Sequence, residues 1–254
     1  MHSPARRNRN IGTVKQGYGQ NNRLRIADSR KDSKLYYERL SRYQKTSAVI
    51  NGHEFVFIVE ATRSGAAHAC SVEDIKRLLT LIPAEDYGKL KLIVLRQPKR
   101  KEEVLSGVWG RLIYSYELEG RFYPAVVLEA VNYSRALKWA KSLSVDDQQE
   151  LARLRADGHA FRETGNSFVA ELEPEAVRNT QLYRTLLHEF GHYVHYCRVV
   201  DHPGCADEDY ETRERRWEAY HKLPWAEKES FAHRYADDLR WKLFQQRLLP
   251  FARL

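Results

Sequence analysis

Residues 183–197 read YRTLLHEFGHYVHYC, and this stretch determines how the rest of the chain is interpreted. His188 and His192 stand four residues apart, so on a helix both imidazoles project from the same face, with Glu189 beside them. Two histidines one turn apart with an adjacent glutamate form the arrangement that a catalytic zinc site needs. Uncharged residues flank the motif, which predicts a buried helix.

Gly191 lies inside this expected helix, between the two histidine turns. Glycine in a helix interior costs about 1 kcal/mol relative to alanine. We therefore expect another element to pack closely against this turn.

A third ligand is needed, because catalytic zinc usually takes three protein ligands and leaves a fourth position for water. Residues 223–249 (LPWAEKESFAHRYADDLRWKLFQQRLL) predict a second helix that begins after Pro224. Glu229 shares one face of it with a stripe of apolar residues, namely Ala232, Ala236, Leu239 and Leu243. Glu227 lies about 200° around the helix from Glu229, on a charged face. A glutamate on the core side is costly unless it is paired or bound to metal, so Glu229 is the predicted ligand.

The motifs HEFGH and, 37 residues after its second histidine, ESFAHRYA resemble those of the gluzincin metallopeptidases. They are especially similar to the catalytic domain of anthrax lethal factor and to the minigluzincins. The resemblance implies an α+β, zincin-like fold, in which a small mixed sheet aligns a peptide substrate along its edge strand beside the HExxH helix, and a following helix carries the glutamate ligand. It also implies a zinc metalloendopeptidase in which His188, His192 and Glu229 bind Zn²⁺ and Glu189 is the general base.

Two further residues near the motifs are given expected roles. Where lethal-factor-like sequences have an acidic residue four positions after the glutamate ligand, this chain has His233, which we expect to support a ligand histidine. Peptide hydrolysis also calls for a donor to the developing oxyanion, and WEAYHKLPW offers Tyr220 or His221. Tyr220 is the predicted donor, and a packing role is its alternative.

A second group of possible metal ligands consists of His195, Cys197, His202 and Cys205. The spacing H-x-C-x₄-H-x₂-C matches no common structural zinc site. A loop after the active-site helix is the simpler interpretation.

The remaining body, residues 47–254, predicts mixed α and β structure. Strands are expected at 48–61 and 89–97, and two more within 104–131, joined by a turn at Glu119 and Gly120. Capped helices are expected after Ser71 and Ser144, the second ending at Gly158, and Pro174 opens the helix that carries HEFGH. A hairpin is expected within 159–172, turning at Gly165 and Asn166.

The net charge of +8 is concentrated at one end of the chain. Residues 1–46 hold 12 Lys and Arg against three Asp and Glu, a net charge of +9, and the rest is nearly neutral. We call residues 1–46 the arm and expect it to be disordered, since it has little apolar periodicity. Its charge allows contact with nucleic acid, but it has no dense Lys/Arg cluster, so a solvated extension is the simpler interpretation. The alternative to the enzyme is thus a non-catalytic zincin-fold binding protein with this arm, but a structural zinc has no need of Glu189.

The expected compartment is the cytoplasm. The first ten residues have no apolar segment behind them, and runs such as LKLIVL are too short to span a bilayer, so neither a secretory leader nor a membrane segment is expected. Three cysteines, at positions 70, 197 and 205, form no disulfide framework, which favours a reducing compartment. A protein or peptide substrate is the expected partner, and the sequence leaves the oligomeric state open.

Overall fold

The computed structural model describes residues 34–105, 108–204 and 208–254. By contacts the chain divides into two units, Met1–Tyr36 and Tyr37–Leu254. Most of the arm, residues 1–33, lies outside the described residues, and with it the expectations of disorder and nucleic-acid contact. The body starts before the expected boundary at residue 47, because strand β1 begins at Tyr43 and its residues 43–46 pair along their whole length with β2.

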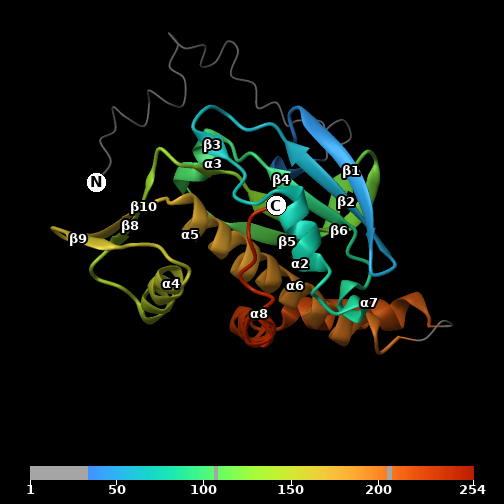
Figure 1. The fold of residues 1–254 in the computed structure, drawn as a ribbon. Helices are drawn as coiled ribbons and strands as arrows, with labels where there is room; N and C mark the ends of the chain where they lie inside the picture. The colour runs from blue at the N-terminus through green and yellow to red at the C-terminus, as the bar shows by residue number, and fades with distance from the viewer. Residues whose placement is uncertain (1–33, 106–107, 205–207) are drawn as a thin grey trace, which may run out of the picture. The chain divides into compact units, whose positions relative to one another are not determined.

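A mixed five-stranded sheet forms the centre of the second unit (Figure 1). Its order is β1 (Tyr43–Ile50), β2 (His53–Glu60), β4 (Leu92–Arg96), β6 (Arg121–Glu129) and β5 (Gly110–Leu118). The three inner strands are parallel, and both edge strands, β1 and β5, run antiparallel to their neighbours. The expectation of a small mixed sheet in an α+β fold is confirmed.

The expected single strand at 48–61 is instead a hairpin, which corrects the sequence interpretation. Asn51 and Gly52 have φ angles of 49° and 80° and connect β1 to β2. Asn-Gly readily adopts these positive angles and forms the tight turn that matches the twist of paired strands. The dipeptide was therefore a usable hairpin signal.

Several local expectations are confirmed. Helix α2 (Val72–Leu79) and helix α4 (Val145–Ala156) both begin with capping boxes, made by Ser71 with Asp74 and by Ser144 with Asp147. Strands β9 (Arg162–Thr164) and β10 (Ser167–Glu171) form the expected hairpin, and β5 joins β6 at Glu119 and Gly120.

Other elements were not expected. Residues 100–105 form a short helix, α3 (Arg100–Leu105), so the first strand expected within 104–131 begins only at Gly110. Strand β8 (Ala136–Ala140) pairs with β10, and helix α7 (Tyr210–Lys222) precedes α8. The smaller elements are η2 (Tyr36–Glu38), η3 (Ala84–Tyr87) and the pair β3 (Ala66–Ala67) and β7 (Val131–Asn132).

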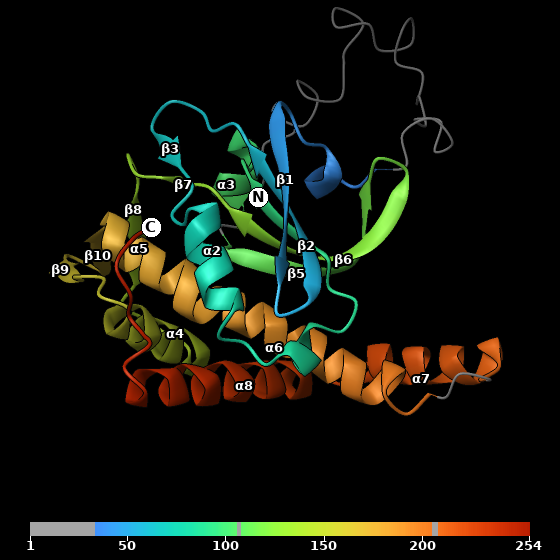
Figure 2. The same cartoon turned by 45° about the vertical axis from the view of Figure 1, so that its right-hand side comes forward.

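One long helical run passes beneath the sheet and carries the HEFGH motif (Figure 2). It begins at Pro174, as expected, and consists of α5 (Pro174–Arg178), the π-helix η4 (Asn179–Thr185), α6 (Leu186–Tyr196) and the π-helix η5 (Cys197–Asp201). Helix α8 (Trp225–Gln245) lies along the far side of α6 and runs in the opposite direction. The sheet thus positions α6, and α6 positions α8.

The main core lies between the sheet and these helices, with fully buried Phe57, Ile93, Leu186 and Phe190 among its members. A smaller cluster covers the opposite face of the sheet, around Ile58, Val94 and Val127. Among the described residues, no helix combines the length and apolarity needed to cross a membrane.

Candidate metal centre

The two histidines of the motif meet a glutamate from the neighbouring helix. The Nε2 atoms of His188 and His192, on successive turns of α6, lie 3.0 Å apart. Each lies 3.3 Å from a carboxylate oxygen of Glu229 on α8. The imidazoles hold the pKa of Glu229 below its ordinary value, because their hydrogen bonds and charges outweigh the opposing effect of burial. Within the described part of the chain, these three residues are the only His, Cys, Asp and Glu group close enough to share one metal ion.

The spacing of these donor atoms fits zinc. At Zn–N and Zn–O bond lengths of 2.0–2.1 Å, two ligands of a tetrahedral ion are separated by about 3.3 Å. The separations found here, 3.0 and 3.3 Å, are close to that edge length. Two neutral imidazoles and one carboxylate are also a donor set that zinc accepts, with the fourth position left for water.

Close packing of α6 on α8 brings Glu229 to the histidines. A Cβ atom built on Gly191 would lie 2.8 Å from both the Cα and the carbonyl oxygen of Ala232, and 3.2 Å from the Cβ of Tyr235. Since the first two atoms belong to the backbone, a side chain here would force the helices apart. The expectation that another element packs closely against Gly191 is therefore confirmed, and that element is α8.

We expect Gly191→Ala to destabilise the protein and weaken its zinc binding. Overpacking costs about 1–3 kcal/mol, against which the better helix propensity of alanine returns about 1 kcal/mol. For a chain of this size each kcal/mol lowers Tm by about 2–4 °C, which calorimetry resolves. Ser230→Ala on the exposed face of α8 is the control. An unchanged Tm together with unchanged zinc affinity for Gly191→Ala would contradict this packing argument.

Glu189 lies beside the ligands without belonging to them. One of its carboxylate oxygens accepts a hydrogen bond from the backbone nitrogen of Leu112 on β5, at 2.7 Å. Burial raises its pKa, and the neighbouring His188 and His192 oppose that rise. A buried carboxylate held in place by the sheet, next to two histidines that are placed to share a metal ion, is suited to receive a proton from water.

His233 is placed close to the ligands, where the sequence put it. Its ring centroid lies 4.4 Å from that of His188, and its Nε2 lies 3.9 Å from a carboxylate oxygen of Glu229. Burial, together with the neighbouring His188, lowers its pKa to about 4. His233 is therefore a neutral side chain at neutral pH that packs on His188.

Tyr220 is near the ligands but is turned away from their donor atoms. Its hydroxyl lies 2.9 Å from that of Tyr114 and donates to the backbone carbonyl of His192 at 3.3 Å. The side chain is buried, which raises its pKa, and it does not line the pocket described below. These contacts describe the packing alternative, and a role for Tyr220 as oxyanion donor stays a prediction. His221, the other residue considered, is exposed, and its ring lies 4.1 Å from that of Trp217 in a tilted arrangement.

The alternative metal cluster is not assembled among the described residues. The ring of His195 stacks on Phe231 at 4.3 Å, and Cys197 is buried with a pKa that burial raises to about 11. Both lie on the helical run, which continues to Asp201 rather than ending in a loop. Cys205 lies outside the described residues.

A buried aspartate joins the two ligand helices, and the sequence did not point to it. Asp157, which directly follows α4, accepts hydrogen bonds from Arg184 at 2.6 Å and from Arg240 at 2.9 Å. Arg184 lies one turn before His188 and also binds both carboxylate oxygens of Glu150. Arg184 lies in η4, directly before α6, and Arg240 lies on α8, so this ion cluster fixes the helical run and α8 to the same point.

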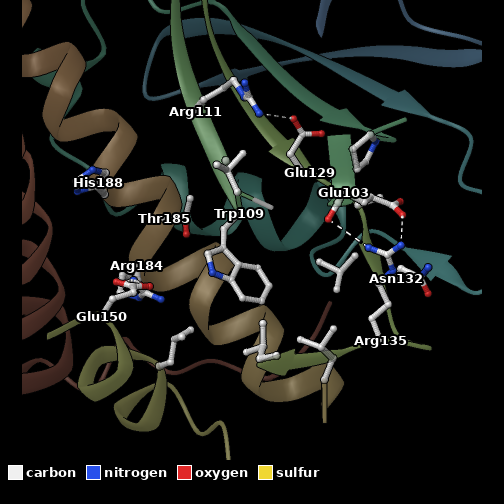
Figure 3. Close-up of a pocket in the computed structure, with 18 of the residues that line it drawn as sticks. Glu103, Trp109, Arg111, Glu129, Asn132, Arg135, Glu150, Arg184, Thr185 and His188 are labelled. Carbon is white, nitrogen blue, oxygen red and sulfur yellow. Dashed lines mark hydrogen bonds and ion pairs between the residues drawn. The ribbon is translucent and has the colours of Figure 1, made fainter. Parts of the chain in front are cut away.

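A pocket of about 570 Å³ adjoins the metal centre, with His188, Glu189, Glu229 and His233 in its wall. Figure 3 shows Trp109 in the middle of this pocket. The charged groups around it are paired, for example Arg111 with Glu129 and Arg135 with Glu103. Its apolar wall comes largely from segments with no motif, including β8 with Leu137 and Trp139.

Comparison of the chain with protein-family models, with curated proteins and with solved structures gave no match. The function of the protein is therefore inferred from the two sequence motifs and from the geometry of their side chains.

Proposed function

We propose that this protein is a zincin-like, zinc-dependent metallopeptidase. The observation that carries the proposal is the convergence of His188, His192 and Glu229 on one point, with a non-ligating carboxylate, Glu189, beside them. A site that only held a structural metal would have no need of that fourth group. The non-catalytic alternative has no comparable observation in its favour.

The edge strand β5 supports a peptide as substrate. It pairs with β6 on one side only, and Leu112 directs its N–H away from β6 toward Glu189. An extended peptide can add to such an edge through main-chain hydrogen bonds, which places its backbone against the metal centre. The pocket beside Trp109 then accepts a side chain next to the bond to be cut.

In the proposed hydrolysis, the metal and Glu189 have different roles. A bound zinc ion would supply Lewis acidity to a water molecule and to the scissile carbonyl. Glu189 accepts a proton from that water as its oxygen bonds to the carbonyl carbon, and the proton passes to the amide nitrogen as the C–N bond breaks. The products are a carboxylic acid and an amine, so no further reactant is required.

The test combines metal analysis with substrate mapping. We expect one zinc per chain, loss of hydrolysis of an unbiased peptide library after chelation, and recovery on adding zinc. Zinc at about 1,000 times its Kd adds about 4 kcal/mol of stability, so the chelated protein should melt roughly 10 °C lower. A protein that binds zinc stoichiometrically but cuts no peptide or protein would favour the binding-protein alternative.

A further inference from the structure

Strand β5 lies along the helical run, and both proceed in the same direction. Successive contacts join Trp109 to Gln181, Leu112 to Glu189 and Tyr114 to Tyr196. The two elements are close enough that a Cβ atom on Gly110 would lie 2.9 Å from a methyl carbon of Thr185. A substrate paired with β5 must therefore follow α6 past both ligand histidines.

The pocket lies on one side of the metal centre. From the helical run its wall includes Arg184 and His188, and from β5 it includes only Gly110 and Arg111. No described residue of β5 beyond Arg111, and none of α7, lines it. Figure 3 shows it extending from His188 past Trp109. The open space therefore follows the beginning of β5.

Aromatic side chains occupy the other side. The ring of Tyr114 lies 4.9 Å from that of Tyr196 and 5.8 Å from that of His221, and its hydroxyl lies 2.9 Å from that of Tyr220. We call these four residues the aromatic wall. The Tyr220 hydroxyl donates to the backbone carbonyl of His192, so the aromatic wall lies against the turn of α6 that carries this histidine. Tyr196 and Tyr220 are buried and Tyr114 is partly buried against them, so side chains are packed closely beside this part of β5.

We propose that the site acts at the end of a chain and removes one or two residues from the amino terminus of a peptide. This inference rests on the proposed peptidase function and narrows it. The pocket lies on the side of Trp109, whereas on the other side the aromatic wall begins at Tyr114, only two positions beyond Leu112, which contacts Glu189. Cleavage within a long chain would require that wall to be displaced.

The polarity follows from how strands pair. Antiparallel pairs are more stable per residue than parallel ones and occur two to three times as often. A substrate antiparallel to β5 runs its carboxyl-terminal part toward Gly110 and the pocket. Its amino-terminal part then meets the aromatic wall at Tyr114. The C–N bond that breaks releases a short amino-terminal fragment with a new carboxylate, and the remaining peptide gains a new amino group.

The test is a time course of cleavage of defined 12-residue peptides, with free or acetylated amino ends, by the full-length zinc-loaded protein. Mass spectrometry of the products assigns each bond cut. We expect a ladder from the amino end, with bonds preceded by four or more residues cut at least about tenfold more slowly. Internal cleavage at comparable rates, or a ladder from the carboxyl end, would overturn the inference and leave the peptidase function standing. No cleavage of any peptide would instead count against the peptidase function itself.

Variants at Tyr114 separate the bulk of the aromatic wall from its hydrogen bond. Tyr114→Phe keeps the ring and loses the hydroxyl, so it should retain the amino-end ladder. Tyr114→Ala opens the path along β5 and should raise internal cleavage about tenfold relative to end cleavage. Ser115→Ala, an exposed position on the same strand, is the matched control. Equal ratios of internal to end cleavage in the two Tyr114 variants would contradict a steric role, and the product map of the unaltered protein decides the case if Tyr114→Ala fails to fold.

Discussion

Glu189→Gln should leave zinc bound at one ion per chain while kcat/KM for peptide hydrolysis falls by about 10²–10⁴-fold. The glutamine amide oxygen can still accept the hydrogen bond of the Leu112 backbone nitrogen, so the position of the side chain and the fold should persist. What disappears is the carboxylate that receives the proton. Zinc analysis, thermal melting and single-substrate kinetics on the same preparation provide the measurement.

The control for this variant is Glu227→Gln, an exposed glutamate on α8 that lies outside the ligand group. It should retain full zinc content and full turnover. Undiminished hydrolysis by Glu189→Gln would remove Glu189 from the mechanism. Loss of zinc from that variant would mean instead that the residue is a ligand.

Glu229→Ala should lose most of its zinc and all measurable hydrolysis. The change leaves two imidazoles 3.0 Å apart with no third donor, and catalytic zinc usually needs three protein ligands. The side chain is only partly buried, so its removal should leave the helix pair folded when zinc is absent. Competition with a chromophoric chelator measures the zinc affinity, and circular dichroism checks the fold.

Variants at two neighbouring residues on α8 serve as controls for this result. Glu227→Ala should change almost nothing, whereas His233→Ala should cost about 10–100-fold in affinity or rate, because it removes a side chain that packs on His188. If Glu229→Ala still binds zinc stoichiometrically and cleaves peptides, the assignment of the third ligand fails. The likeness of the chain to the glutamate branch of the zincins would fail with it.

The sequence predicted best those features that depend only on the periodicity of a helix. The spacing of His188 and His192 fixes their common face once α6 is a helix. The apolar stripe of Ala232, Ala236 and Leu239 orients Glu229 in the same way, and all three of these residues are buried in the structure. Gly191 also indicated that another element packs closely against this turn of the helix. The sequence did not show that the residue in contact is Ala232.

The features that escaped prediction depend on contacts between distant segments. Leu112 contacts Glu189 across 77 positions, and Asp157 binds Arg240 across 83, with no local pattern at either end. Helix α7 buries only Tyr220, so it lacks the apolar stripe by which a helix is recognised. By contrast, the hairpin of β1 and β2 had a local signal in Asn51 and Gly52, and the expectation of a single strand missed it.

The separation of the ligands along the chain has a consequence for the newly made protein. Glu229 follows His192 by 37 residues, so at about 5–20 residues per second the ribosome adds it roughly 2–7 s after the histidine pair. Until α8 has been synthesised and has docked against Gly191, the nascent chain displays two histidines and no complete set of donors. The order of synthesis thus delays assembly of the metal centre until the sheet and the HEFGH helix have both been made, and an unfinished chain would carry no working site.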